Sequence, residues 1–134
     1  MYLVDTSVWI DYLREKNTSS TKYFSEVIEN KIPFGITGLI YQEIIQGALT
    51  KKDFDLLVDY LGTQYFFHPA DEIQTYQNAA ETYFKCRRKG LTIGSSVDCL
   101  IAQIAIENNL TLIHNDKDFL LIQKVLPSLK LIPS

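Results

Sequence analysis

Short apolar runs alternate along the chain with longer stretches in which apolar residues recur at helical spacing. The runs that we expect as strands cover residues 2–4, 33–36, 64–67, 110–113 and 129–132. Strands that alternate with helices are typical of a parallel sheet covered on both faces. The pattern therefore predicts an α/β fold with three layers, α/β/α, around a central parallel sheet of about four or five strands.

The stretches between these runs predict helices. They are expected over about residues 38–49, 51–61, 70–89 and 117–125, in a segment that ends near residue 30, and from residue 97 onward. The first helix should start at a cap formed by Thr6 or Ser7. It should then carry Trp9, Tyr12 and Leu13 at helical spacing.

Two carboxylates follow expected strands, and two more lie on expected helices. Asp5 and Asp116 come after the first and fourth runs, so if those strands are parallel neighbours both acids emerge at the carboxyl edge of one sheet. Glu43 shares a helix face with apolar residues, and Asp98 lies in the first turn of an apolar helix. Four converging acids without a competing cysteine or histidine cluster predict a site for hard divalent cations.

Each acid also has an interpretation without chemistry. Asp5 and Asp116 precede helices and would serve as N-caps, and Asp98 with Ser95 fits a capping box. Glu43 lies in mid-helix, where the alternative is a surface side chain that extends to water. The combination of all four acids favours a functional site.

Length and composition narrow the class of protein. The chain has 134 residues, 46% of them apolar, which predicts a single domain over residues 1–134. No apolar stretch approaches the roughly 20 residues of a membrane span, and an acid occurs as early as Asp5, so we expect a cytoplasmic protein without membrane contact. Cys86 and Cys99 form no metal-binding pair and are expected as buried free thiols.

The charge balance argues against wrapping a nucleic acid by bulk electrostatics. The net charge is −3, from 13 basic and 16 acidic residues. Without the four candidate acids the balance is 13 to 12, so one bound dication would largely reverse the local sign. The single basic cluster, Lys85 with Arg87, Arg88 and Lys89, provides candidate RNA contacts, although cations also suit a helix C-terminus.

Four segments occur in order along the chain: LVDTSVWID at residues 3–11, YQEI at 41–44, GSSVDCLIA at 94–102 and HNDKDF at 114–119. They resemble the four motifs of PIN-domain ribonucleases of the VapC toxin type, each of which supplies one acid. Here these acids are Asp5, Glu43, Asp98 and Asp116, and Asp118-Phe119 is the structural continuation of the last motif. His114 stands where many members have Ser or Thr, and its role stays open.

The resemblance implies a PIN-like fold and a single-strand endoribonuclease that depends on Mg²⁺, for which Mn²⁺ substitutes, and that hydrolyses RNA with a metal-activated water. All four acids would be catalytic. Asp5, Asp98 and Asp116 would hold one or two metal ions, while Glu43 would ligate a second ion or position the water. Thr6, Ser7 and Asn115 would support these ligands or orient substrate.

The resemblance also implies partners and leaves two other functions to compare. A VapC-type toxin would form a homodimer and bind a small VapB-like antitoxin that lays an apolar segment across the first helices, near Trp9 or around Tyr23 and Phe24. A receiver-like signalling domain would need an acidic neighbour beside Asp5, which is absent. A non-catalytic PIN-like RNA-binding scaffold usually loses site acids, and none is missing here.

Overall fold

Five parallel strands form a single sheet in the computed structural model, which describes residues 1–134. The strand order is β3-β2-β1-β4-β5. The strands are β1 (Tyr2–Val4), β2 (Phe34–Thr37), β3 (Tyr65–Phe67), β4 (Thr111–Ile113) and β5 (Lys130–Ile132). The predicted central parallel sheet of four or five strands is confirmed.

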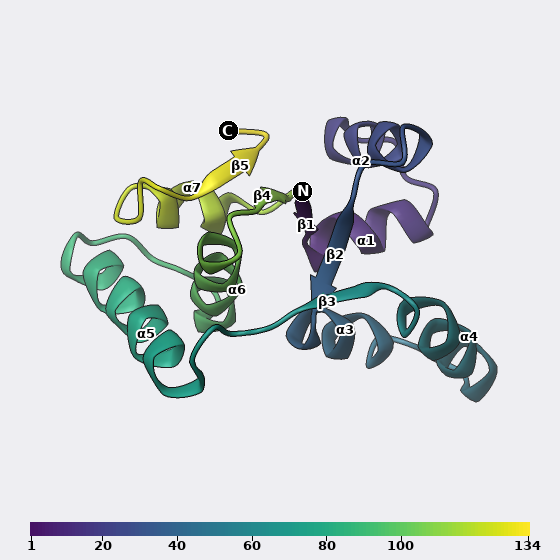
Figure 1. Cartoon of the computed structure of the whole chain (residues 1–134), viewed down its shortest axis with the longest axis horizontal. Coiled ribbons are helices and arrows are strands. Elements are labelled where there is room, and N and C mark those ends of the chain that lie inside the picture. Colours follow the sequence, from purple (N-terminus) through teal and green to yellow (C-terminus); the bar gives the residue numbers. More distant parts are fainter.

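Helices cover both faces of this sheet (Figure 1). On one side lie α1 (Thr6–Leu13), α2 (Ser19–Glu29), α3 (Gly38–Ile45) and α4 (Lys51–Leu61), and on the other lie α5 (Glu72–Arg88), α6 (Ser96–Glu107) and α7 (Lys117–Gln123). The two groups form because β1 leads outward to β3 through the first four helices, whereas the chain then returns to β4 and β5. The three-layer architecture predicted from the sequence is therefore confirmed.

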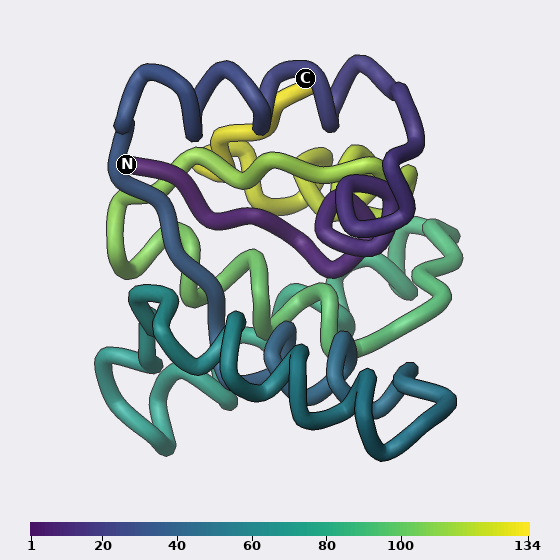
Figure 2. Tube along the Cα trace, turned by 90° about the vertical axis from the view of Figure 1, so that its right-hand side faces the viewer, coloured from purple at the N-terminus to yellow at the C-terminus, as the bar shows by residue number.

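β1 and β4 are parallel neighbours although they lie at opposite ends of the sequence (Figure 2). Leu3 pairs with Leu112 and Val4 with Ile113. The pairing continues past the strands, because the N–H of Asp5 donates to the carbonyl of Ile113 at 2.9 Å. The carboxyl ends of β1 and β4 consequently meet at one edge of the sheet, so the condition under which Asp5 and Asp116 would share this edge is met.

Three of the helix boundaries that differ from the sequence prediction have a clear cause. Asp5, not Thr6 or Ser7, is the N-cap of α1, where its carboxylate accepts from the N–H of Ser7. The predicted helix over residues 38–49 ends at Ile45, because the N–H groups of Gly47 and Ala48 donate to carbonyls only three residues earlier. The predicted helix over residues 70–89 begins at Glu72, since Asp71 caps it with bonds from two backbone N–H groups.

Trp9 is a core residue and not a surface contact. Its exposure is 0%, and the rings of Tyr12, Phe24 and Phe34 pack against it. Its Nε1 is buried without a hydrogen-bond acceptor, so the indole is held by packing alone. An antitoxin segment cannot reach Trp9 or the equally buried Phe24, and Tyr23 is engaged with the hydroxyl of Tyr2 at 2.7 Å.

The two thiols are buried and free. Cys86 is 0% and Cys99 is 1% exposed, as the sequence predicts. Burial raises the pKa of the Cys99 thiol to about 12, which keeps it protonated and unreactive. None of the helices combines the length and the apolar character that a membrane crossing requires.

Candidate metal-binding site

The first acid is held at the start of α1 by the residues that follow it. Asp5 is 4% exposed and accepts from both the N–H and the Oγ of Ser7, at 3.1 and 2.6 Å. Ser7 Oγ accepts in turn from the backbone N–H of Asn115 at 3.0 Å. This chain of bonds ties the β1–α1 junction to the loop that follows β4.

The helical acid joins the same junction from α3. Glu43 is half-buried, and its carboxylate accepts from the Oγ1 of Thr6 at 3.1 Å. Burial raises the pKa of Glu43, the Thr6 bond opposes this, and the charge of Asp5 adds to the rise. Glu43 is thus directed to the carboxyl edge of the sheet and is not a surface side chain extended to bulk water.

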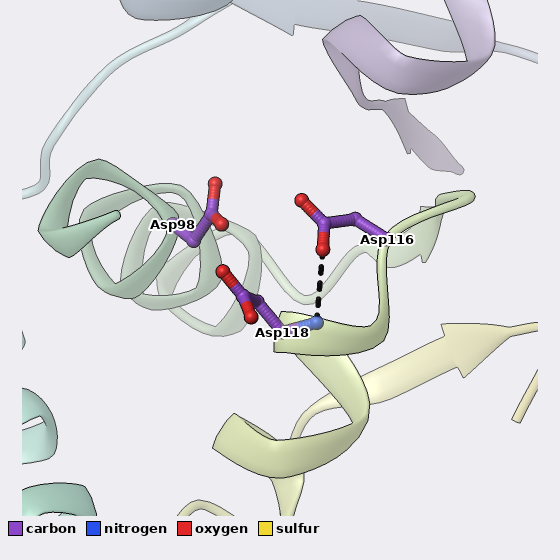
Figure 3. Close-up of side chains that lie close together, drawn as sticks. All are labelled: Asp98, Asp116 and Asp118. Carbon is purple, nitrogen blue, oxygen red and sulfur yellow. Dashed lines mark hydrogen bonds between the residues drawn. The ribbon is translucent and has the colours of Figure 1, made fainter. Parts of the chain in front are cut away.

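Three further carboxylates converge at the starts of α6 and α7. One oxygen from each of Asp98, Asp116 and Asp118 lies within 4.8 Å of the others, and Figure 3 shows the three side chains directed toward a shared space. Asp98 comes from the first turn of α6, Asp116 from the N-cap of α7 and Asp118 from its first turn. The structure therefore brings Asp98 and Asp116 together, as the sequence predicts.

Asp118 is a candidate site residue that the sequence reasoning missed. The fourth motif treats it as structural continuation, yet it is 8% exposed and belongs to the tight group in which Asp5 is not included. Its Oδ2 accepts from the N–H of Gly94 at 2.9 Å, and its own N–H donates to Asp116 Oδ1 at 2.9 Å. The Asp-x-Asp spacing was the available signal, because the first Asp caps the helix and the second lies in its first turn.

Gly94 allows the close approach between the α5–α6 connection and α7. A Cβ on this residue would lie 3.2 Å from Asp118 Oδ2, tighter than ordinary van der Waals contact. The small residue therefore lets its own N–H reach the carboxylate. This contact sets the start of α6, with Asp98, against the start of α7, with Asp116.

Asp98 is affected by the charges of all four other acids. Burial raises its pKa to about 8, and the charges of Asp5, Asp116, Asp118 and Glu43 each contribute to the rise. Its carboxylate has no hydrogen-bond donor within the protein, and the predicted Ser95–Asp98 capping box does not form, because Ser95 alone caps α6 through the N–H of Val97. A buried carboxylate without a donor is suited to a cation.

Asp5 and Asp116 cap helices and also belong to the acidic cluster, which consists of Asp5, Glu43, Asp98, Asp116 and Asp118. Both caps exist, since Asp5 accepts from Ser7 and Asp116 from Asp118. Each acid nevertheless interacts with other carboxylates. Burial raises the pKa of Asp5, the bonds from Ser7 oppose this rise, and the charge of Asp116 adds to it. The two interpretations left open by the sequence are therefore compatible, because one oxygen can cap while the other remains available.

Two residues next to Asp116 have different surroundings. His114 is 2% exposed, and its ring nitrogens contact backbone groups of Asp116 and the carbonyl of Pro133. It therefore connects the loop after β4 to the segment after β5. Asn115 is exposed, and its side-chain amide donates to Asp11 on α1 at 3.1 Å. The polar neighbours of the acids are thus used to hold the loop in place.

The side chains of the basic cluster line two different hollows. Arg87 lies over the ring of Tyr83, beside a hollow that Ser96 and Val97 also line. Arg88 lies over Phe84 and shares a different hollow with Lys85 and Lys89. The cluster is therefore not one continuous surface.

The fold and the acids together define a class of protein. A 3-2-1-4-5 parallel sheet carries five carboxylates at its carboxyl edge, where they offer only oxygen ligands of the kind that hard divalent cations bind. Receiver-like domains have the strand order 2-1-3-4-5, so that alternative is wrong. The class is an α/β protein with an acidic cation site at the strand ends.

Comparison with known proteins agrees with this class. Residues 2–125 match the PIN domain family. The chain is 31% identical to ribonuclease VapC11 from Mycobacterium tuberculosis over 129 residues, which cover 93% of each protein. It is also 31% identical, over the same coverage, to VapC ribonuclease Mb1587 from Mycobacterium bovis. The chain belongs to the PIN-domain family and, within it, to the VapC ribonucleases.

A solved structure shows the same fold. VapBC-1 from nontypeable Haemophilus influenzae superposes with a TM-score of 0.72 at 21% identity, covering 97% of this chain and 95% of that one. At that identity the likeness concerns the arrangement of helices and strands. It confirms the PIN-like fold that the four motifs predict.

Proposed function

We propose that this chain is a metal-dependent endoribonuclease that cleaves single-stranded RNA by hydrolysis. The observation that carries the proposal is the convergence on Asp98, whose pKa is raised by burial and by the charges of every other candidate acid. Such repulsion is costly without a cation, and a bound dication would offset it. The relatives named as VapC ribonucleases support RNA as the substrate.

We assign the metal ligands to Asp5, Asp98 and Asp116, with Asp118 as an addition to this set. Mg²⁺ is the proposed ion, with Mn²⁺ as a substitute, because all donors are carboxylate oxygens. A dication at this position supplies Lewis-acid stabilisation of phosphate charge and lowers the pKa of water. The donor set fits such an ion, since Asp98 has no competing hydrogen bond.

Glu43 is proposed to orient the attacking water and to accept its proton. Its half-buried carboxylate and raised pKa suit a general base. Thr6 would hold Glu43 in place, and Ser7 with Asn115 would fix Asp5 against the loop of Asp116. No covalent nucleophile is needed in this arrangement.

We further propose that the protein is the toxin of a VapBC-type pair, neutralised by a small VapB-like antitoxin. A hollow of about 450 Å³ between α1, α3 and α4 fits an apolar partner segment. Leu13, Leu49 and Leu56 line it and are 39%, 95% and 58% exposed. Glu43 lines the same hollow, so a segment bound there would cover the acidic site and could direct a cation toward it.

The homodimer implied by the family is proposed to use the outer face of α5. Ile73 and Tyr76 are 79% and 54% exposed on this helix. A hollow of about 450 Å³ beside these residues is lined mostly by apolar side chains, among them Tyr76 and Tyr83, so a second copy would bury apolar surface there. Light scattering should show a mass of two chains, reduced to one by Tyr76→Glu.

The test of the enzymatic proposal uses metal removal and return. Purified protein should cleave single-stranded RNA with Mg²⁺ or Mn²⁺, stop with excess chelator and resume when the metal is restored. Asp98→Asn, prepared in the same way, should be inactive, which excludes a contaminating nuclease. Cleavage that continues in chelator contradicts the metal mechanism, and RNA binding without any cleavage by the metal-loaded protein would favour the non-catalytic scaffold.

A further inference from the structure

The ends of α5 and α7 form a basic hollow that lies apart from the acidic cluster. Its volume is about 460 Å³, and it is lined by Phe84, Lys85, Arg88, Lys89, Lys124 and Val125. None of the lining residues is acidic, and only Lys85 has a salt-bridge partner, Glu81 at 2.9 Å. Three cations therefore stand without a carboxylate in a chain whose net charge is −3.

Both walls of this hollow lead directly to the acidic cluster. α7 starts beside Asp116 and ends next to Lys124, a helix of 7 residues and roughly 10 Å. The other wall, the end of α5, continues through the connection in which Gly94 donates to Asp118. Helices α5 and α7 lie side by side (Figure 1). Because the two ends of α7 lie only about 10 Å apart, a strand of a few nucleotides is long enough to span the acids and the hollow.

The chemistry of the hollow suits an unpaired polynucleotide strand. Phe84 is 50% exposed, and the guanidinium of Arg88 lies 5.7 Å from its ring centroid. An exposed aromatic ring beside unpaired cations offers a stacking surface for a base and charge for the phosphates around it.

We propose that this hollow, formed by Arg88, Lys89 and Lys124 around Phe84, binds the backbone of the RNA substrate outside the cleavage site. The inference rests on the proposed function, because it gives the strand at the acidic cluster a second point of attachment. Lys124 is not part of the basic cluster in the sequence, because it lies at the C-cap of α7. The hollow raises affinity for longer strands and takes no part in the chemistry.

The test measures binding separately from cleavage. In the Asp98→Asn background, a labelled single-stranded RNA is titrated against the protein and against Arg88→Gln/Lys124→Gln, which keeps much of each aliphatic stem. The expected result is roughly tenfold weaker binding, with a salt slope reduced by about 1.4 for two lost phosphate contacts on a single strand. Lys22→Gln/Lys52→Gln, with the same charge change on α2 and α4, is the matched control and should bind normally.

Two further arms complete the test. The charge-preserving pair Arg88→Lys/Lys124→Arg should restore binding, and in the active protein Arg88→Gln/Lys124→Gln should raise KM for long RNA while leaving kcat unchanged. The inference is overturned if Arg88→Gln/Lys124→Gln and the control variant bind RNA with equal affinity and equal salt slope, even if cleavage is normal. Weakened binding to duplex DNA without weakened RNA binding would also overturn it. Failure of the active protein to cleave would concern the proposed function alone.

Discussion

Ser7 and Asn115, at opposite ends of the sequence, are joined by a hydrogen bond of 3.0 Å from the backbone N–H of Asn115 to Ser7 Oγ. The same hydroxyl donates to Asp5 at 2.6 Å. The loop that carries Asp116 is thereby fastened to the residue that holds Asp5. The distance between Asp5 and Asp116 consequently depends on Ser7 and Asn115, whose contacts hold the two segments together and need not involve the substrate.

Asp11 on α1 holds the same loop through a second hydrogen bond. Its carboxylate accepts from the side-chain amide of Asn115 at 3.1 Å, with Lys16 at 4.0 Å. Asp11→Ala should raise the metal concentration needed for half-maximal cleavage by roughly 10–100-fold, because partners of this kind orient ligands. Asp11→Asn keeps an acceptor oxygen and should stay near the parent value. Equal metal requirement for Asp11→Ala and the exposed control Asp55→Ala would show that the bond does not position the site.

Capping and catalysis can be separated at Asp5 and Asp116. Asparagine caps a helix about as well as aspartate, so Asp5→Asn and Asp116→Asn should abolish cleavage without lowering the free energy of unfolding. Asp5→Ala should lose cleavage and also about 1 kcal/mol of stability, since the cap disappears. Thermal melts beside single-turnover cleavage measure both. Active, destabilised variants would reduce these acids to caps.

The raised pKa of Asp98 predicts how the metal-free protein responds to pH. Between 3.8 and about 8 the folded protein retains a proton on Asp98 that the unfolded chain has released. The contribution of Asp98 to the free energy of unfolding should therefore be complete below pH 3.8 and should fall as the pH rises toward 8. Denaturant melts in chelator across this range measure the fall.

Asp98→Asn should make that fall smaller but not remove it, because the pKa values of Asp5 and Glu43 are also raised. Adding Mg²⁺ or Mn²⁺ to the parent protein should flatten the profile, since the ion binds the deprotonated carboxylates. An identical pH profile for the parent and Asp98→Asn would contradict the electrostatic account of the cluster.

The partner surface is predicted at Leu49 and Leu56. Expression of the toxin alone should arrest growth, and co-expression with the antitoxin should restore it. Leu49→Glu/Leu56→Glu should abolish the rescue and the co-purified complex while cleavage persists, because both side chains are exposed. Trp9→Ser, by contrast, should lose about 3–5 kcal/mol of stability as a core truncation. A complex that survives the double change would place the antitoxin elsewhere.

Periodicity and strand pattern were enough to predict the layers and the parallel sheet, whereas the pairing of β1 with β4 was only assumed as the condition that brings Asp5 and Asp116 together. They could not place Trp9, because Trp9, Tyr12 and Leu13 recur at helical spacing whether the helix face meets the core or solvent. Here α2 packs over α1 and buries Trp9 against Phe24, while Leu13 stays exposed. The packing of α2 over α1 therefore decides which side chains of α1 are buried.

At the site, four acids could be named from motifs, but the grouping of their oxygens could not. Asp118 joins Asp98 and Asp116 because Gly94 reaches across from the connection before α6, a contact between residues 24 apart in sequence. Likewise, Lys124 lies beside Arg88 only through the packing of α7 on α5. Such long-range pairs leave no periodic signal in a single sequence.

The chemistry of the RNA ends tests the central claim most directly. Purified protein is incubated with a defined single-stranded RNA and Mg²⁺, with Asp98→Asn in parallel, and the product termini are identified by mass spectrometry. Hydrolysis by water at the acidic cluster predicts 5′-phosphate and 3′-hydroxyl ends from the parent protein and no products from the variant. Products that carry 2′,3′-cyclic phosphates, formed by attack of the ribose hydroxyl, would contradict it.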